Sequence, residues 1–145
     1  MSIAKFVSLS MCLFALTLNS KAAPNDPPKD APKAAPPEAK VEELMSKDLP
    51  DFPGKEGLMI TVVYPPGSSD PVHRHNAHAF VYVLEGTIVM QVKGGKEVTL
   101  TPGQTFYEGP DDVHIVGRNA SKTKPAKFVV FLIKNKNAPV LIPVN

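Results

Sequence analysis

The sequence predicts an all-β fold, a sandwich or barrel of short strands, over most of the chain after Leu58. Runs of β-branched and aromatic residues recur there, as in LMITVVY, FVYVLEG, TIVMQV and KFVVFLIK. Turn signals such as Pro65-Pro66-Gly67 and Thr101-Pro102-Gly103 separate these runs. Short strands between regularly placed turns are typical of antiparallel sheets that pack together or close into a barrel. With 145 residues, the chain is expected to hold one folded domain.

The first 22 residues have the features of a secretory signal peptide. Lys5 supplies the positive charge, Phe6 to Leu18 is largely apolar, and Ser20-Lys21-Ala22 offers small residues for cleavage. The apolar run is too short and wrongly flanked for a membrane span. We therefore predict that residues 1–22 are removed on export and that the mature protein is periplasmic or secreted.

Removal of residues 1–22 would leave a formally neutral chain without cysteine. The full sequence has 16 Lys and Arg against 14 Asp and Glu, and Lys5, Lys21 and the single cysteine, Cys12, all lie in the leader. Loss of the leader removes the only candidate for disulfide or thiolate chemistry. A neutral chain gives no electrostatic reason to bind nucleic acid or an anionic membrane. We expect a small-molecule partner, no nucleic acid and no membrane insertion of the mature protein.

Two segments precede the predicted strands. Residues 23–40 read APNDPPKDAPKAAPPEAK, with six prolines, five alanines and no large apolar side chain. Such a segment cannot bury enough surface to offset the entropy of ordering, so it is predicted to be a disordered tether. In the domain proper, residues 41–145, Val41, Leu44, Met45 and Leu49 have helical spacing. This spacing predicts a short N-terminal helix that ends before Pro50.

All four histidines of the chain fall in two windows, GSSDPVHRHNAHAFVYVLEG at residues 67–86 and GQTFYEGPDDVHIVGRN at residues 103–119. In an extended strand His73 and His75 point to the same face. A closed barrel can bring His114 from the second window beside them. Neutral imidazoles bind borderline divalent metals such as Fe, Mn, Ni, Cu or Zn. We predict that these three histidines bind a metal ion; the alternative is a set of hydrogen-bonded histidines without metal.

The two windows resemble the two motifs of the cupin family, G-x5-H-x-H-x(3,4)-E-x6-G and G-x5-P-x-G-x2-H-x3-N. The positions that match are Gly67, His73, His75 and Gly86 in the first motif, and Gly103, His114 and Asn119 in the second. The resemblance spans roughly Leu58 to Ile133. It implies the double-stranded β-helix, or jelly-roll barrel, of the cupins, here with a short N-terminal helix.

The sequence departs from these motifs at several positions. Ala79 and Phe80 stand where the first motif has its Glu ligand. In the second motif Gly109 and Asp111 occupy the Pro and Gly positions, and Asn119 comes one residue late. Without the Glu, a site of three histidines would keep the full charge of a divalent metal, which favours deprotonation of a bound water or substrate.

Two further side chains are candidates for the missing ligand. By strand parity His78 faces away from His75, but a bend at Asn76-Ala77 would reset the parity and make His78 a fourth ligand. His78 could instead support the ligands or lie at the barrel rim. Glu108 is a weaker candidate, as a carboxylate near the site. The sequence leaves these alternatives open.

The resemblance leads to two hypotheses of function and one of assembly. The first function is that of an exported metal-dependent enzyme, dioxygenase-like or an isomerase, acting on a small oxygenated molecule. Cupins with three histidines that open diketones with oxygen imply that the Glu is dispensable for catalysis. The second is that of a non-catalytic module that holds a metal or a small ligand. The runs FVYVL and FVVFLI put apolar side chains on both strand faces, which together with the resemblance predicts a homodimer.

Overall fold

Residues 35–144 are described by a computed structural model, and every helix or strand element among them is a β-strand. They belong to a compact unit that runs Ala34–Asn145. The prediction of an all-β domain is confirmed. The predicted signal peptide and the first part of the predicted tether lie outside the described residues. Within the described part no helix is long and apolar enough to cross a bilayer.

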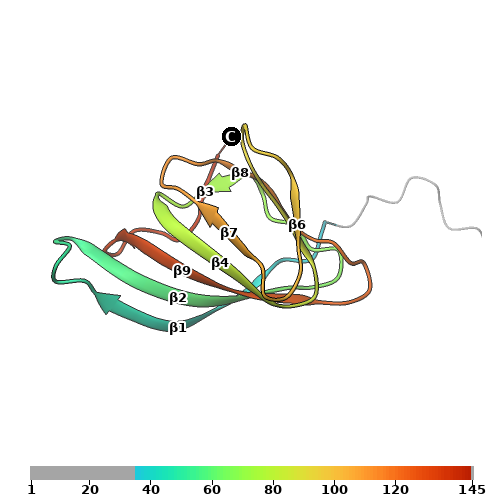
Figure 1. The fold of residues 1–145 in the computed structure, drawn as a ribbon, viewed down its shortest axis with the longest axis horizontal. Helices are drawn as coiled ribbons and strands as arrows, with labels where there is room; N and C mark the ends of the chain where they lie inside the picture. Colours follow the sequence, from blue (N-terminus) through green and yellow to red (C-terminus); the bar gives the residue numbers. More distant parts are fainter. Residues whose placement is uncertain (1–34, 145) are drawn as a thin grey trace, which may run out of the picture. The chain divides into compact units, whose positions relative to one another are not determined.

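Ten strands form two antiparallel sheets of five strands each (Figure 1). The first sheet has the order β1-β2-β9-β4-β7 and contains β1 (Lys40–Asp48), β2 (Lys55–Tyr64), β4 (Ala77–Glu85), β7 (Thr105–Glu108) and β9 (Ala126–Asn135). The second has the order β10-β3-β8-β5-β6 and contains β3 (His73–Arg74), β5 (Ile88–Val92), β6 (Val98–Leu100), β8 (His114–Asn119) and β10 (Ile142–Pro143). The chain passes between the sheets several times, so each histidine window contributes to both.

The hydrophobic core lies between the two sheets. In β4 and β9 buried side chains alternate with more exposed ones, as expected for strands with one face on a core. Burial of apolar surface is the main favourable contribution to such a packing. The core is made by Leu58, Ile60, Val62, Tyr64, Ala77, Ala79, Val81, Val83, Ile88, Met90, Leu100, Ala126, Phe128, Val130 and Leu132.

The short helix predicted after the tether is wrong, because this segment is strand β1. It pairs with β2 along its length, and a bulge interrupts the register between Glu43 and Met45. The bulge changes which face later residues occupy: Val41 is opposite Val62, on the core side, whereas Met45 is opposite Met59. A bulged strand therefore produces the same spacing of apolar residues as a helix. Backbone pairing with β2 decides between the two.

The predicted boundary between tether and domain also changes. Ala39, which the proline-rich composition assigns to the tether, is partly buried against the hydrophobic core. Lys40 already belongs to β1. The residues just before Val41 therefore pack with the domain, because they lead directly into an edge strand of its first sheet.

Two residues from the histidine windows hold turns at the ends of the sheets. Gly86 has φ +75°, and a Cβ there would lie 2.6 Å from the Pro125 carbonyl oxygen, so no other residue fits. The buried Asn119 amide donates to the carbonyls of Tyr64 and Lys124 at 3.1 and 2.8 Å. Asn119 thus ties the end of β8, in the second sheet, to the end of β2, in the first.

Candidate metal centre

The three histidines that the sequence predicts as ligands lie together between the sheets. His73 in β3 is directly opposite His114 in β8, and their ring centroids are 4.9 Å apart. His75 follows β3, and its ring centroid lies 4.8 Å from that of His73. The short pairing of β3 with β8 in the second sheet therefore brings both windows to one point, as the sequence predicts.

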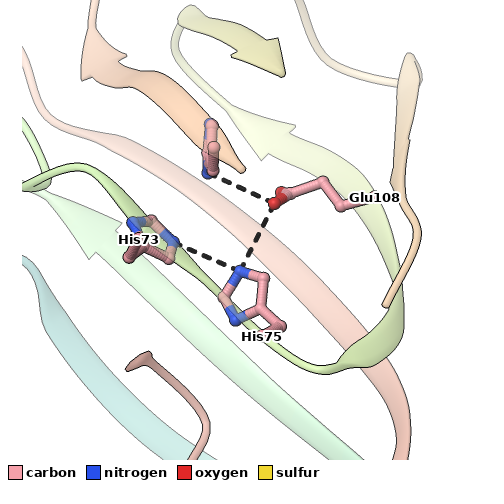
Figure 2. Close-up of side chains that lie close together, drawn as sticks. His73, His75 and Glu108 are labelled. Carbon is pink, nitrogen blue, oxygen red and sulfur yellow. Dashed lines mark hydrogen bonds and ion pairs between the residues drawn. The ribbon is translucent and has the colours of Figure 1, made fainter. Parts of the chain in front are cut away.

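Backbone carbonyls fix the orientation of two of the rings. His73 Nδ1 donates to the Pro71 carbonyl at 2.8 Å, and His75 Nδ1 donates to the Val140 carbonyl at 2.6 Å. The two Nε2 atoms then face each other at 3.2 Å (Figure 2). A neutral imidazole with its proton on Nδ1 presents a lone pair at Nε2. Two lone pairs at this distance repel each other unless a proton or a cation lies between them.

The carboxylate that is missing from β4 is supplied by the neighbouring strand. Ala79, at the position of the motif's Glu, is directly opposite Glu108 of β7. Residues opposite each other in an antiparallel pair project to the same side, and both are buried. Glu108 Oε2 lies 3.5 Å from His75 Nε2 and 3.3 Å from His114 Nδ1 (Figure 2 shows the contact with His75). The small Ala79 leaves the space that the longer side chain fills.

The fourth histidine, His78, lies outside this cluster. Odd-numbered residues of β4 are buried and even-numbered ones exposed through Tyr82, so His78 points to the outer face of the sheet. Its Nδ1 is 2.7 Å from the Tyr107 hydroxyl. Asn76 does adopt a left-handed conformation, with φ 47°, but the bend does not turn His78 inward. His78 is therefore not placed to be a ligand, and Glu108, the weaker candidate, takes the fourth place.

Burial favours the uncharged forms of Glu108, His75 and His114. It raises the pKa of Glu108 to about 8, and the charges of Asp112 and Asp70 add to the rise. It lowers the pKa of His114 to about 4 and lowers that of His75 as well. At neutral pH the contacts of Glu108 with these histidines are therefore not ion pairs between charged groups. Without a bound ion, attraction between opposite charges therefore does not stabilise the contacts of Glu108 with His75 and His114.

These residues fit a divalent transition metal. One ligand atom from each of His73, His75, Glu108 and His114 lies within 4.8 Å of the others. Both ring nitrogens of His114 and Oε2 of Glu108 are buried without a hydrogen-bond partner, which is costly unless something binds them. Imidazole and carboxylate ligands suit Fe, Mn, Ni, Cu and Zn. With Glu108 bound, the centre would carry one positive charge instead of the two expected for three histidines alone.

A cavity of about 490 Å³ opens beside the four residues. Its walls are mostly apolar and come from the inward faces of β2, β4, β5 and β9; they include Ile60, Val62, Val81, Met90, Phe128, Val130 and Leu132. Another part of the lining comes from Glu38, Ala39, Val41, Val140 and Leu141. Sites of this size with apolar walls and a few convergent polar groups are typical of small-molecule binding.

The sequence contains one signal for Glu108, which it otherwise marks only as the weaker candidate. An acidic residue ends the short strand Phe106-Tyr107-Glu108, six residues before His114. The position of Glu108 near the end of a strand follows from the sequence, but the residue that lies opposite it in the sheet does not. The pairing of Ala79 with Glu108 depends on the register of β4 and β7, which the sequence alone does not state.

The comparisons with known proteins agree with this architecture. The profile of the cupin domain family matches residues 60–132, half of the chain, and the chain therefore belongs to the cupin family. The match includes β4, β5, β7 and β8 and all four residues of the cluster. A search of curated proteins finds no significant match.

Solved structures show the same fold. A double-stranded β-helix protein from Klebsiella pneumoniae is 17% identical with a TM-score of 0.58, covering 78% of this chain and 90% of the other. Oxalate oxidase bound to glycolate is 25% identical with a TM-score of 0.56, covering 73% and 55%. A DMSP lyase from Ruegeria pomeroyi is 20% identical with a TM-score of 0.53, covering 61% and 43%. This chain thus spans about half of each of these two enzymes. The expected double-stranded β-helix is confirmed.

Proposed function

We propose that this protein is an exported, metal-dependent cupin enzyme that acts on a small oxygenated molecule. The observation that carries the proposal is the set of four ligand atoms within 4.8 Å at the wall of a 490 Å³ cavity. A bound metal would supply Lewis-acid or redox chemistry to a substrate in that cavity. Oxidative cleavage is the first reaction to test, and isomerisation the second.

The chain's own residues account for the binding part of this function. His73, His75, Glu108 and His114 would hold the metal, and the carbonyls of Pro71 and Val140 orient two of the rings. Such partners behind the ligands commonly contribute 10–100-fold in metal affinity. The apolar walls exclude water from the reacting atoms and strengthen electrostatic interactions inside the cavity.

A non-catalytic binding module is the alternative. Its main support in the sequence was the missing carboxylate, and Glu108 now supplies a carboxylate at the same point of the barrel. The match to oxalate oxidase, an enzyme, at 25% identity also favours catalysis. The metal site belongs to both functions, so only turnover distinguishes them.

The deciding experiment is metal analysis of protein purified from its own compartment, followed by oxygen uptake with diketones, flavonols and catechols. An enzyme of the proposed kind consumes oxygen with at least one class, and Glu108→Gln loses that uptake while His78→Ala keeps it. Metal at one equivalent without turnover of any substrate, by oxygen uptake or by product analysis for isomerisation, would favour the binding module.

Export and dimerisation are also proposals. Export rests on the leader pattern of residues 1–22, and N-terminal sequencing of the mature protein tests it. Dimerisation is supported by the outer face of the first sheet, where the aromatic side chains Phe80, Tyr82 and Tyr107 are each about half exposed. Contiguous exposed aromatic side chains commonly mark protein interfaces. A second copy of this chain, with the same patch, is the occupant that we propose.

A further inference from the structure

The described residues that line the cavity beside the metal centre include acidic side chains and three histidines, but no lysine or arginine. Among the described residues that line it, Glu38, Asp70 and Glu108 are acidic, and none is Lys or Arg. Glu38 is exposed where it lines the cavity. A substrate that enters would therefore meet negative charge from the protein, and its only positive partner would be the metal.

Asp70 is held inside the cavity by a buried tyrosine. The Tyr64 hydroxyl, on a side chain only 1% exposed, donates a hydrogen bond to Asp70 Oδ2. The Asp70 backbone N–H donates to the Gly117 carbonyl at 2.8 Å. Both contacts fix the carboxylate, because they hold its side chain and its backbone from two different strands.

Gly117 shows that this pair lies next to the metal centre. A Cβ on Gly117 would be 3.0 Å from both the Tyr64 hydroxyl and His114 Cε1, and 3.2 Å from Asp70 Oδ2. Because Gly117 has no side chain, the Tyr64 hydroxyl, the Asp70 carboxylate and the His114 imidazole can lie close together around it. A molecule bound to the metal at His114 would therefore lie within reach of Asp70.

The balance of charges then selects among substrates. Two carboxylates, Glu108 and Asp70, offset the charge of a divalent metal, and Glu38 adds a third near the cavity edge. An additional carboxylate on a substrate would be repelled by Asp70 in a largely apolar cavity, where such repulsion is poorly screened. A neutral hydroxyl or an ammonium group would instead donate to Asp70. The Tyr64 hydroxyl already donates its proton to Asp70 Oδ2, so it does not donate to a substrate carboxylate.

We propose that the cavity takes small uncharged or cationic molecules that carry a hydroxyl group, and that Asp70 is the residue that disfavours carboxylates. This inference rests on the proposed function, since it needs a metal at the four-residue cluster. It also argues against oxalate, a dianion, as the substrate of this chain, although an oxalate oxidase shares its fold.

Three ligands with the same diol and different charge test the inference. They are 4-methylcatechol, which is neutral, 3,4-dihydroxybenzylamine, which is cationic, and 3,4-dihydroxybenzoate, which is anionic. Mature protein loaded with Co(II) is titrated with each, and the dissociation constant is read from the cobalt absorption bands and from calorimetry. We expect the benzoate to bind about tenfold more weakly than the other two, as one unpaired like-charge contact in a partly wet cavity would cause.

Two variants assign the selectivity to Asp70. Asp70→Asn should bring the benzoate to within about twofold of 4-methylcatechol, because the repelling charge is gone while the shape remains. Tyr64→Phe is the matched control, since it keeps the carboxylate and should keep the discrimination. Cobalt content should equal that of the wild type in both. Glu38→Gln, at an exposed site, should improve benzoate binding about twofold or less, since solvent screens its charge.

The outcomes separate this inference from the proposed function. Protein that takes up no cobalt would overturn both. Protein that takes up cobalt but binds the benzoate as tightly as 4-methylcatechol, or binds none of the three ligands, would overturn the charge selection and leave the metal centre standing. If Asp70→Asn still bound the benzoate more weakly than 4-methylcatechol by the wild-type factor, Asp70 would not be the cause of the selectivity. The wild-type comparison needs no variant, so failure of a variant to fold would not prevent the test.

Discussion

The two faces of strand β4 differ in chemistry although their residues alternate along one backbone. Toward the core the strand presents small side chains, Ala77, Ala79, Val81 and Val83, each at most 2% exposed. Toward the outside it presents His78, Phe80 and Tyr82, all exposed. The inner face leaves space for Glu108 and the cavity, whereas the outer face carries exposed rings and a hydrogen bond between His78 and Tyr107.

The comparison shows that position, not residue type, gives a histidine its role in this protein. His75 and His78 are three residues apart, yet His75 is largely buried beside Glu108 and has a lowered pKa, while His78 is exposed. His78 lies within β4, whose even-numbered residues face outward, whereas His75 lies between β3 and β4 and is held by the Val140 carbonyl. The predictions below test this separation, in order of decreasing effect.

The largest effect is expected from His75→Ala. It removes one of four ligand groups that lie within 4.8 Å of one another, and it should lower metal affinity by more than about 100-fold, above the cost of losing an outer hydrogen-bond partner. His78→Ala is the control from the outer face and should leave affinity unchanged. Elemental analysis and competition with a chelator measure both. Equal losses in the two variants would contradict the separation of faces.

Glu108 should come next. Glu108→Gln keeps the shape but replaces the anionic ligand with a neutral amide oxygen, so metal affinity should fall by at least about tenfold, the lower end of the cost of losing an outer hydrogen-bond partner. Because Ala79 lies directly opposite, the double variant Ala79→Glu with Glu108→Ala should recover most of that affinity by moving the carboxylate across the strand pair. A double variant no better than Glu108→Ala alone would show that the two positions are not equivalent.

Metal affinity should also depend on pH through Glu108. The pKa of Glu108 is raised to about 8 by burial, so a metal must displace its proton below that pH. Affinity should therefore fall up to about tenfold per unit as pH drops from 8 toward 6, while His114, with its pKa lowered to about 4, stays neutral. Calorimetry in buffers of different ionisation enthalpy counts the released proton. In Glu108→Gln this dependence should shrink.

On the outer face, Phe80→Lys should convert the proposed dimer into a monomer. A charge among half-exposed aromatic side chains is costly to bury in an interface, and Phe80 is 5.3 Å from Tyr107 by ring centroids. Light scattering should give half the wild-type mass, with metal content unchanged. Lys93→Glu, at an exposed hairpin turn, is the control. A wild-type protein that is already a monomer would overturn the dimer and leave the metal site in place.

The smallest effect concerns the segment before β1. A protein that begins at Val41 lacks Glu38 and Ala39, which line the cavity, and Ala39 also packs on the core. Its melting temperature should be about 2–4 °C below that of a protein that begins at Ala35, as expected for the loss of well under 1 kcal/mol. Identical melting curves would restore the boundary predicted from composition.

The sequence by itself determined the strands after Leu58, the two histidine windows and the side to which most residues of those strands face. Periods of two residues and turn residues are local properties, so they can be read without the fold. The same parity correctly put His73 and His75 together and His78 on the other side. The resemblance of the windows to cupin motifs was enough to predict the barrel.

Only the tertiary structure decided the fourth side chain of the cluster and the nature of the first element. Glu108 replaces the expected carboxylate because β7 pairs with β4 in the register that sets it opposite Ala79, and register is a relation between distant segments. Residues 40–48 form a strand because β2 offers them a free edge and a bulge accommodates their apolar spacing. In both cases the deciding interaction is a backbone pairing with another strand, which no local pattern in the sequence records.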